Sequence, residues 1–287
     1  MELVAELDIR NWQGPFPRAV TALLEAGQVL VAPDLHFDLR PGEYRFLSPD
    51  CLDGKSKNVS YRPASGAVQG TNSTGRDRDD LKAMLCRYYW HSSALASTLF
   101  PEYRDCLMPG FTSFRPAEIA GRETSWRKDD TRLHIDAFPS RPTQGLRILR
   151  IFTNVNPSLP RLWRVGEPFE QVAKTFLPHV RPPLPGSAWL LFRFDITKNL
   201  RTPYDHLMLG IHDRMKADDT YQRECAQIEL PISAGATWAC FTDAVSHAAM
   251  SGRFAFEQTF YLPVDAMLEP LHSPLRILER LTGRVLA

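Results

Sequence analysis

Residues 131–142 read TRLHIDAFPSRP, a short apolar stretch that ends in a turn rich in proline. Within it, His134 and Asp136 flank a single isoleucine. If this stretch is a β-strand, alternate side chains point to the same face, so an imidazole and a carboxylate would lie side by side. Both groups are common metal ligands, and together they would fill two positions of a metal site. The third ligand has to come from another part of the chain.

The sequence around this stretch predicts a mostly β protein with added helices. From about residue 110 onward, short apolar runs are separated by Pro and Gly, and six of them predict strands: TRLHIDAF, LRILRIFTNV, SAWLLFRFDI, CAQIELPI, TWACFTDAV and FAFEQTFYL. One helix, EPFEQVAKTFL, is expected between them. Short strands after a helical start indicate a double-stranded β-helix, the jelly-roll or cupin-like core.

We expect a single domain over residues 1–287 with three parts. Residues 1–109 would form a loop and helical region, residues 110–264 the jelly-roll core, and residues 265–287 a C-terminal helical tail. In the first part, residues 51–80 are rich in Gly, Ser and Asn and predict a long loop that orders over a site, followed by a helix. The tail, SPLRILERLTGRVL, predicts an amphipathic helix, and we favour packing on the core over the alternative that it rests on a membrane.

Composition and charge indicate an ordinary folded protein. Of the 287 residues, 44% are hydrophobic and 23% charged, and the formal net charge is +1. This balance gives no global attraction to nucleic acid, so no nucleic-acid partner is expected. The N-terminus does not resemble a secretory signal, and no apolar run reaches the roughly 18 residues of a membrane span. Five cysteines without a C-x-x-C pair indicate reduced thiols, so we expect a cytoplasmic location, at most peripheral to a membrane.

The candidate for the third ligand is His247, in FTDAVSHAAMSGRF at the end of a predicted strand. Roughly 110 residues separate it from Asp136, which leaves room for several strands to bring a late strand beside an early one. Two imidazoles and one carboxylate leave metal positions open, as in non-haem Fe(II) oxygenases. A second His-x-Asp pair, His36 and Asp38, lies before the predicted strands, and we do not expect it to bind metal.

Such an iron site usually takes a 2-oxo acid, whose far carboxylate needs a basic partner, and arginine meets a carboxylate with two hydrogen bonds. Arg253 follows His247 by six residues, although a pairing with Glu257 would explain it as well. We favour the group after the His-x-Asp stretch, where Arg161 and Trp163 alternate onto one face. The residues alone do not decide between Arg161 and Arg253. The other members of the favoured group are Arg147, Arg150, Arg164 and the amide donor Asn154.

Two longer motifs, HIDAFPSRPTQGLRILRIFTNVNP and LGIHDRMKADDTYQ, together with the Ser-His before a Gly-Arg strand, resemble the Kdo 3-hydroxylases. The resemblance covers residues 55–263. It implies an Fe(II)- and 2-oxoglutarate-dependent dioxygenase that uses O2 to hydroxylate the sugar 3-deoxy-D-manno-oct-2-ulosonic acid (Kdo) at C3. The implied partner is Kdo-lipid A or a related lipopolysaccharide precursor, and the enzyme would touch the cytoplasmic face of the inner membrane peripherally.

The resemblance also implies roles for individual residues. The iron ligands would be His134, Asp136 and His247. The 2-oxoglutarate site would comprise Arg115, Asn154, Arg161 and Trp163. His212 would stand near the iron without binding it, although a bond to Asp213 would explain it as a structural histidine. In the predicted loop, the candidates for contacts with an anionic substrate are Lys55, Lys57 and Arg62.

Three other functions retain part of this interpretation. A hydroxylase of another substrate would keep the same ligands and change only the pocket. A cupin-like metal-dependent sugar isomerase would use its metal as a Lewis acid and would not consume 2-oxoglutarate. A sugar-binding jelly roll without catalysis would need no iron. Formation of succinate separates the oxygenases from the other two.

Overall fold

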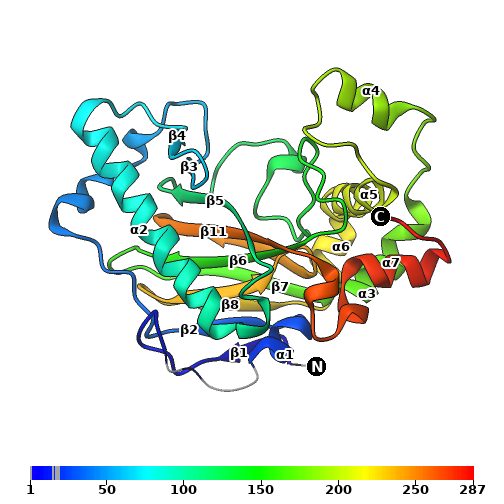
Figure 1. Cartoon of the computed structure of the whole chain (residues 1–287), viewed down its shortest axis with the longest axis horizontal. Coiled ribbons are helices and arrows are strands. Elements are labelled where there is room, and N and C mark those ends of the chain that lie inside the picture. Colours follow the sequence, from blue (N-terminus) through cyan, green and yellow to red (C-terminus); the bar gives the residue numbers. More distant parts are fainter. Residues whose placement is uncertain (1, 15, 17–19) are drawn as a thin grey trace.

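Two β-sheets face each other in the computed structural model, which describes residues 2–14, 16 and 20–287 (Figure 1). Over these residues the larger sheet has eight strands in the order β1-β2-β9-β6-β11-β5-β3-β4, and the smaller has three in the order β10-β7-β8. The large-sheet strands are β1 Val4–Glu6, β2 Val29–Ala32, β3 Val59–Arg62, β4 Ala67–Gln69, β5 Met108–Arg115, β6 Arg147–Asn154, β9 Thr237–Phe241 and β11 Ala255–Leu262. The small-sheet strands are β7 Arg161–Pro168, β8 Ile228–Ile232 and β10 Val245–Ser251.

The centre of the large sheet is β6, which is buried along its whole length. It pairs antiparallel with β11 over eight residues and with β9 on its other side. Between the two sheets, the Phe152 and Trp238 rings stack at 5.0 Å, and the Trp163 ring meets both edge-on at 5.0 and 5.3 Å. These aromatic contacts hold the sheets together beside the candidate site.

Helix α2, Gly75–Leu99, crosses the outer face of the large sheet (Figure 1). Its buried side chains recur at helical spacing, and the Tyr88 ring stacks on Phe256 of β11 at 4.7 Å. Helix α3 packs on the small sheet, and α5 lies beside the candidate site. The remaining helices are α1 Val20–Glu25, α3 Phe169–Phe176, α4 Ser187–Arg193, α5 Pro203–Ala217, α6 Asp219–Glu224 and α7 Pro274–Thr282. None of the helices in the described ranges is both long and apolar enough to cross a membrane.

Most predicted elements are confirmed. The structure has strands at four of the six predicted positions, β6, β8, β9 and β11, and helices at α2, α3 and α7. The arrangement of two facing sheets agrees with the predicted jelly-roll core. In α7, Leu275, Ile277 and Leu278 are buried, so its apolar face packs on the protein as predicted.

Besides the predicted strand TRLHIDAF, which forms only a single bridge, three predictions of local structure are wrong. The run SAWLLFRF is the exposed helix α4 rather than a strand. The predicted loop at residues 51–80 contains the β3–β4 hairpin, and β3 pairs with β5, because Val59, Tyr61 and Val68 alternate into the core. This hairpin forms the edge of the large sheet, so residues 59–69 are part of the sheet rather than of a long loop. Residues 1–109 are accordingly mixed rather than helical, since they supply four large-sheet strands.

Candidate metal and co-substrate site

The His-x-Asp stretch is extended, but it joins neither sheet as a regular strand. A single antiparallel bridge connects it to β10, in which the N–H of His134 donates to the carbonyl of His247 at 3.0 Å and the reverse bond measures 2.9 Å. The N–H of Asp136 donates to the carbonyl of Thr242 at 2.8 Å. Main-chain hydrogen bonds therefore place the early stretch beside the late strand, as the sequence predicted.

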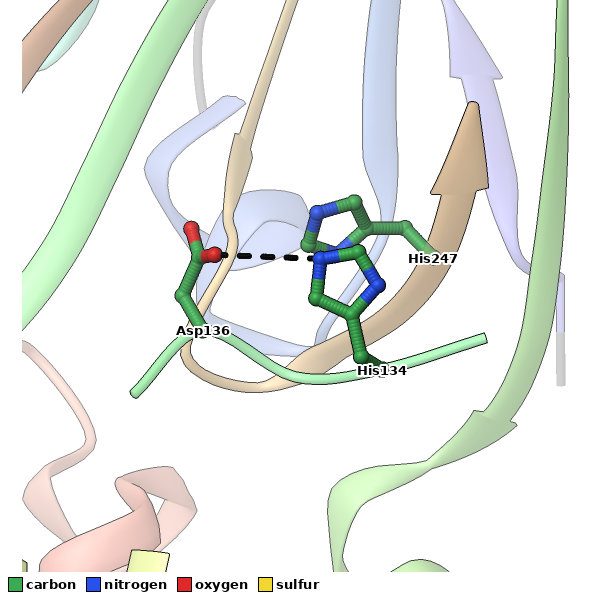
Figure 2. Close-up of side chains that lie close together, drawn as sticks. All are labelled: His134, Asp136 and His247. Carbon is green, nitrogen blue, oxygen red and sulfur yellow. Dashed lines mark ion pairs between the residues drawn. The ribbon is translucent and has the colours of Figure 1, made fainter. Parts of the chain in front are cut away.

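The side chains of His134, Asp136 and His247 converge (Figure 2). One potential ligand atom from each lies within 4.8 Å of the other two, and His134 Nε2 is 4.0 Å from Asp136 Oδ1. The Nδ1–H of His134 donates to the carbonyl of Arg132, and that of His247 to the carbonyl of Val245, both at 2.8 Å. Both Nε2 atoms therefore keep a lone pair for a metal, with the rings fixed from behind.

Burial and nearby charges hold these groups in the protonation states that a metal requires. Burial lowers the pKa of His134 well below its usual value, and His247 lowers it further. Burial also lowers the pKa of His247, outweighing the opposite effect of Asp136. Burial alone would raise the pKa of Asp136, but nearby charge, above all that of Arg150, outweighs burial and the pKa falls. Two neutral imidazoles and one carboxylate fit a divalent transition metal such as Fe(II).

A buried row of alternating charges supports Asp136. The Nη1 atom of Arg150 lies 3.1 Å from Asp136 Oδ2 and 3.5 Å from Glu257 Oε1. On the other side, Arg115 donates to Glu257 Oε2 from Nε at 3.1 Å and from Nη2 at 2.7 Å. One oxygen of Asp136 therefore faces Arg150 while the other faces His134, which orients the carboxylate toward the metal position.

A cavity of about 550 Å³ opens between the two sheets at this point. The large sheet contributes side chains from β5, β6 and β11, and the small sheet from β7 and β10. The volume is that of a small-molecule site. Its lining residues are Arg115, Arg127, Lys128, Asp130, His134, Asp136, Ala137, Phe138, Pro139, Arg150, Phe152, Arg161, Trp163, Leu209, His212, Asp213, Lys216, His247, Ala249, Ala255 and Glu257.

The structure brings Arg161 and Trp163 into this cavity together. Arg161 is 4% exposed and donates from Nη1 to the carbonyl of Gly252 at 3.1 Å. Burial, and then the charge of Arg115, lowers the pKa of Arg161 to about 10, which still leaves it positive at neutral pH. The Trp163 ring stacks on His247 at 5.2 Å, and its indole N–H is buried with no acceptor among the described residues. A cation and a free donor beside the metal position suit a carboxylate ligand.

Arg253 lies outside the cavity. Its side chain is exposed, and its guanidinium group lies 4.9 Å from the centre of the Phe254 ring. The alternative pairing with Glu257 is also wrong, because Glu257 faces Arg115 and Arg150. Of the two candidate carboxylate partners, the geometry favours Arg161.

Asn154 is not brought to the cavity either, contrary to the sequence-based expectation. Its amide nitrogen donates to the carbonyls of Leu159, Ile232 and Ser233 at 3.0–3.2 Å. Its amide oxygen accepts the N–H of Asn156 at 3.1 Å. The side chain is thus occupied by the turn between β6 and β7, and supports the start of the strand that carries Arg161.

His212, on α5, lines the cavity in the way that both interpretations foresaw. Its ring lies edge-on to that of His134, with 5.7 Å between the centres. Its Nδ1 is 2.9 Å from Asp213 Oδ1, and Arg127 donates to the other oxygen of Asp213 at 3.2 Å. The histidine is therefore positioned near the metal position by a carboxylate that is itself held.

The predicted substrate-binding cations do not line the cavity. Lys57 is the nearest, since its Nζ lies 3.1 Å from Oδ2 of the lining residue Asp130. Arg62 is exposed and lies 5.2 Å from the centre of the Phe111 ring. Lys55 is exposed in the turn before β3. These three residues therefore do not form one cluster.

Lys216 was not among the predicted site residues, but it is 2% exposed and lines the cavity from α5. Burial lowers the pKa of its amine, although Asp130 counteracts this. It lies one helical turn after His212, so the helical spacing in LGIHDRMKADDTYQ would have placed both on one face. With Lys216, the lining carries six Lys or Arg side chains against four Asp or Glu, an excess that favours an anionic ligand.

A profile of the family described as 3-deoxy-D-manno-oct-2-ulosonic acid (Kdo) hydroxylase matches residues 13–285. The chain belongs to the Kdo hydroxylase family. The family predicted from the sequence is therefore confirmed, and with it the class of Fe(II)- and 2-oxoglutarate-dependent dioxygenases.

Solved structures of another Kdo hydroxylase, KdoO, share this fold. KdoO is described as a non-haem Fe(II) alpha-ketoglutarate-dependent dioxygenase. Its complex with alpha-ketoglutarate and Fe(III) is 44% identical, with a TM-score of 0.96 over 100% of this chain and 98% of that one. Its complex with cobalt(II) is also 44% identical, with a TM-score of 0.97 over 99% of this chain and 97% of that one. Its complex with succinate and Fe(III) is 44% identical as well, with a TM-score of 0.96 over the same shares of the two chains. A search of curated proteins with the present chain found no match.

Proposed function

We propose that this protein hydroxylates Kdo at C3 on Kdo-lipid A or a related lipopolysaccharide precursor. The reaction would consume 2-oxoglutarate and O2 and yield succinate, CO2 and the hydroxylated sugar. The observation that supports it best is the convergence of His134, Asp136 and His247 on a cavity that also holds Arg161. Membership of the Kdo hydroxylase family supports the sugar.

His134, Asp136 and His247 would bind Fe(II) and leave its other positions open. Bound Fe(II) would supply the activation of O2 and the oxidation of a C–H bond. The protein contributes the geometry: Arg150 holds the Asp136 carboxylate, and the Trp163 ring limits the rotation of His247.

Arg161 would bind the far carboxylate of 2-oxoglutarate, with Arg115 adding positive charge and Trp163 its free indole N–H. Arg115 is oriented for this by Glu257, which occupies its Nε and Nη2. The arrangement supports a dicarboxylate with one end at the metal and the other at Arg161.

His212 and Lys216 would serve the substrate side of the cavity. The Nδ1–H of His212 donates to Asp213, which leaves Nε2 of His212 free to face the reacting atoms. Lys216 would attract the carboxylate of Kdo. Lys57 would act indirectly, by holding the side chain of the lining residue Asp130 in place. Because the proposed substrate is attached to a lipid, we also propose that the protein contacts the membrane that carries this lipid peripherally.

The test is turnover of purified protein with Fe(II), 2-oxoglutarate, O2 and Kdo-lipid A, in which succinate and the mass of the lipid are followed together. We expect both succinate and a mass gain of one oxygen atom, and the loss of both in His134→Ala. Succinate without the mass gain would indicate another substrate. No succinate from protein that binds Fe(II) would contradict the proposal.

The carboxylate partner is tested separately by the KM for 2-oxoglutarate. Arg161→Ala should raise it by roughly 30-fold or more, because a buried carboxylate loses a partner worth about 2 kcal/mol or more. Arg253→Ala, the matched control, should leave it unchanged. A larger effect at Arg253 would contradict the assignment.

A further inference from the structure

Helix α4 and its flanks, residues 184–200, expose an unusual amount of apolar surface, and we call them the α4 segment. It stands away from the two sheets (Figure 1). Seven of the sixteen exposed large apolar side chains among the described residues lie here, and Leu184 and Phe194 are 78% and 70% exposed. These seven are Leu184, Trp189, Leu190, Phe192, Phe194, Ile196 and Leu200. Such a concentration marks a contact surface, whereas scattered exposed residues would need no explanation.

The exposure is built into an ordered segment. The side chain of Thr197 is fully buried, and the N–H groups of Ile196 and Thr197 donate to the carbonyl of Leu191 at 2.9 and 3.2 Å. The N–H of Phe194 donates to the carbonyl of Leu190 at 3.0 Å. The hydrogen bonds thus close the end of α4 while the apolar side chains remain outside.

The α4 segment is fastened to the wall of the cavity. Lys198 N–H donates to the carbonyl of Ser140 at 2.9 Å, and the Arg201 side chain donates to that of Pro139 at 2.8 Å. Pro139 lines the cavity and lies three residues after Asp136. On its other side the segment leads into α5, which carries His212 and Lys216. A surface that binds the α4 segment would therefore be held close to the cavity.

The charges around the apolar side chains are mostly positive. The α4 segment with its nearest flanks, residues 181–201, carries four basic side chains, Arg181, Arg193, Lys198 and Arg201, against the single acid Asp195. Lys198 pairs with Asp195 at 2.9 Å, which leaves the three arginines as the excess positive charge. Basic residues beside Trp, Phe and Leu on a short exposed helix are typical of segments that lie in the interface of anionic bilayers. The seven residues of α4 are far too few to cross the bilayer.

We propose that the α4 segment inserts into the surface of an anionic lipid bilayer and holds the cavity beside it. The proposal rests on the proposed function only for the idea that the substrate is lipid-linked. The other candidate contact, α7, is already packed on the protein through Leu275 and Leu278.

The test is the binding of the full chain to vesicles of phosphatidylglycerol and phosphatidylethanolamine, measured by sedimentation without iron, co-substrate or Kdo. We expect binding that is much weaker to phosphatidylcholine vesicles. The triple variant Leu184→Ser, Trp189→Ser, Phe194→Ser should lose at least about tenfold in partitioning, because three large apolar side chains leave the bilayer. The matched control removes three exposed apolar side chains elsewhere: Trp90→Ser, Leu268→Ser and Leu271→Ser. It should change binding by less than about twofold, and unaltered melting curves would show that both variants fold.

A second readout places the segment in the bilayer. Brominated lipids should quench the emission of Trp189, and this quenching should disappear in Trp189→Phe while the vesicle binding remains. Wild-type protein that does not bind the anionic vesicles would overturn the proposal. An equal loss of vesicle binding in the control variant would also overturn it. So would a dimer that the triple variant converts to monomer, since the apolar surface would then bind a second copy.

Failure of the proposed function would look different. Vesicle binding without succinate formation from Kdo-lipid A would leave the docking proposal standing and contradict the activity. Turnover of dispersed Kdo-lipid A without vesicle binding would do the reverse.

Discussion

Arg150 is shared by two buried carboxylates, those of Asp136 and Glu257. Glu257 has a second partner in Arg115, whereas Arg150 is the only Lys or Arg that pairs with Asp136 among the described residues. A buried charge that loses its partner costs several kcal/mol. Arg150 therefore connects the proposed iron ligand to the stability of the protein.

Replacement of Arg150 should disturb both properties. We expect Arg150→Met to lower the free energy of unfolding by about 3–5 kcal/mol, because Asp136 remains buried without its cation. The affinity for Co(II) should fall about 10- to 100-fold, since the carboxylate loses its orientation. Denaturant unfolding and metal titration measure the two effects.

The control is Arg280→Met, which removes an exposed pair with Glu170. Such pairs contribute less than about 1 kcal/mol, and this one lies outside the cavity, so Co(II) binding should not change. Unaltered Co(II) affinity in Arg150→Met would show that Arg150 does not orient the ligand.

The cysteines should differ sharply in reactivity. All five are free, but Cys51 and Cys240 are buried while Cys106 is exposed. Burial raises the pKa of Cys51 to about 11 and also raises the pKa of Cys240, which suppresses their thiolates. At neutral pH, N-ethylmaleimide should modify Cys106 first, and peptide mass spectrometry should find Cys51 and Cys240 modified only in concentrated urea. Labelling of Cys240 at the rate of Cys106 would contradict the buried assignment.

At this scale the sequence predicted residue types better than residue roles. The three proposed ligands were identified because His-x-Asp and a late histidine form a recognisable pattern. The arginines after them could not be separated, because their partners are distant in the chain: Arg147 pairs with Asp243 at 2.7 Å, and Arg150 with Asp136 and Glu257. Only the fold shows that, of Arg147, Arg150 and Arg161, Arg161 alone lines the cavity without a carboxylate partner among the described residues.

Among the elements, the turn between β10 and β11 controls the position of Arg161. Gly252 in this turn has a φ of +109°, and its carbonyl accepts the hydrogen bond from Arg161 Nη1. A Cβ at this position would lie 3.0 Å from Arg161 Cγ and 3.1 Å from its Cα. The backbone of β7 cannot yield as easily as a flexible side chain could.

Gly252→Ala should therefore lower stability by about 1–3 kcal/mol through backbone strain and also raise the KM for 2-oxoglutarate by displacing Arg161. Thermal unfolding and steady-state kinetics measure the two. The matched control is Gly54→Ala, which has a φ of +75° but no atom within 4 Å of the added Cβ. Gly54→Ala should lower stability through the same backbone strain but leave the KM for 2-oxoglutarate unchanged. Equal KM values in both variants would argue against the turn as a support for Arg161.

Strands with regular apolar alternation were predictable, and the errors have physical causes. An apolar run such as SAWLLFRF suggests a buried strand, because composition does not reveal that tertiary structure leaves it exposed as α4. The β3–β4 hairpin was missed because its strands have four and three residues and lie among turn residues. Both segments depend on contacts far along the chain.

For the molecule as a whole, the proposed metal would join distant parts of the fold. The His-x-Asp stretch precedes β6, while His247 belongs to β10 of the other sheet. A ligand that binds only the folded state stabilises it by about 2.7 kcal/mol at a hundredfold excess over its Kd. We expect Co(II) at that excess to raise the Tm by roughly 4–5 °C.

His134→Ala should abolish this rise in differential scanning calorimetry. His206→Ala is the control, because His206 is outside the cavity and bonds to the carbonyl of Arg181. It should keep the full metal-dependent rise. A rise that persists in His134→Ala would indicate that Co(II) binds elsewhere.

The stacking of Trp163 on His247 gives the protein an optical property as well as a structural one. The two rings are 5.2 Å apart with 19° between their planes. A paramagnetic ion bound to His247 would then lie close enough to the indole of Trp163 to quench its fluorescence. Occupancy of the site would be visible as quenched tryptophan emission, without any added dye, and Trp163→Phe should remove most of this quenching.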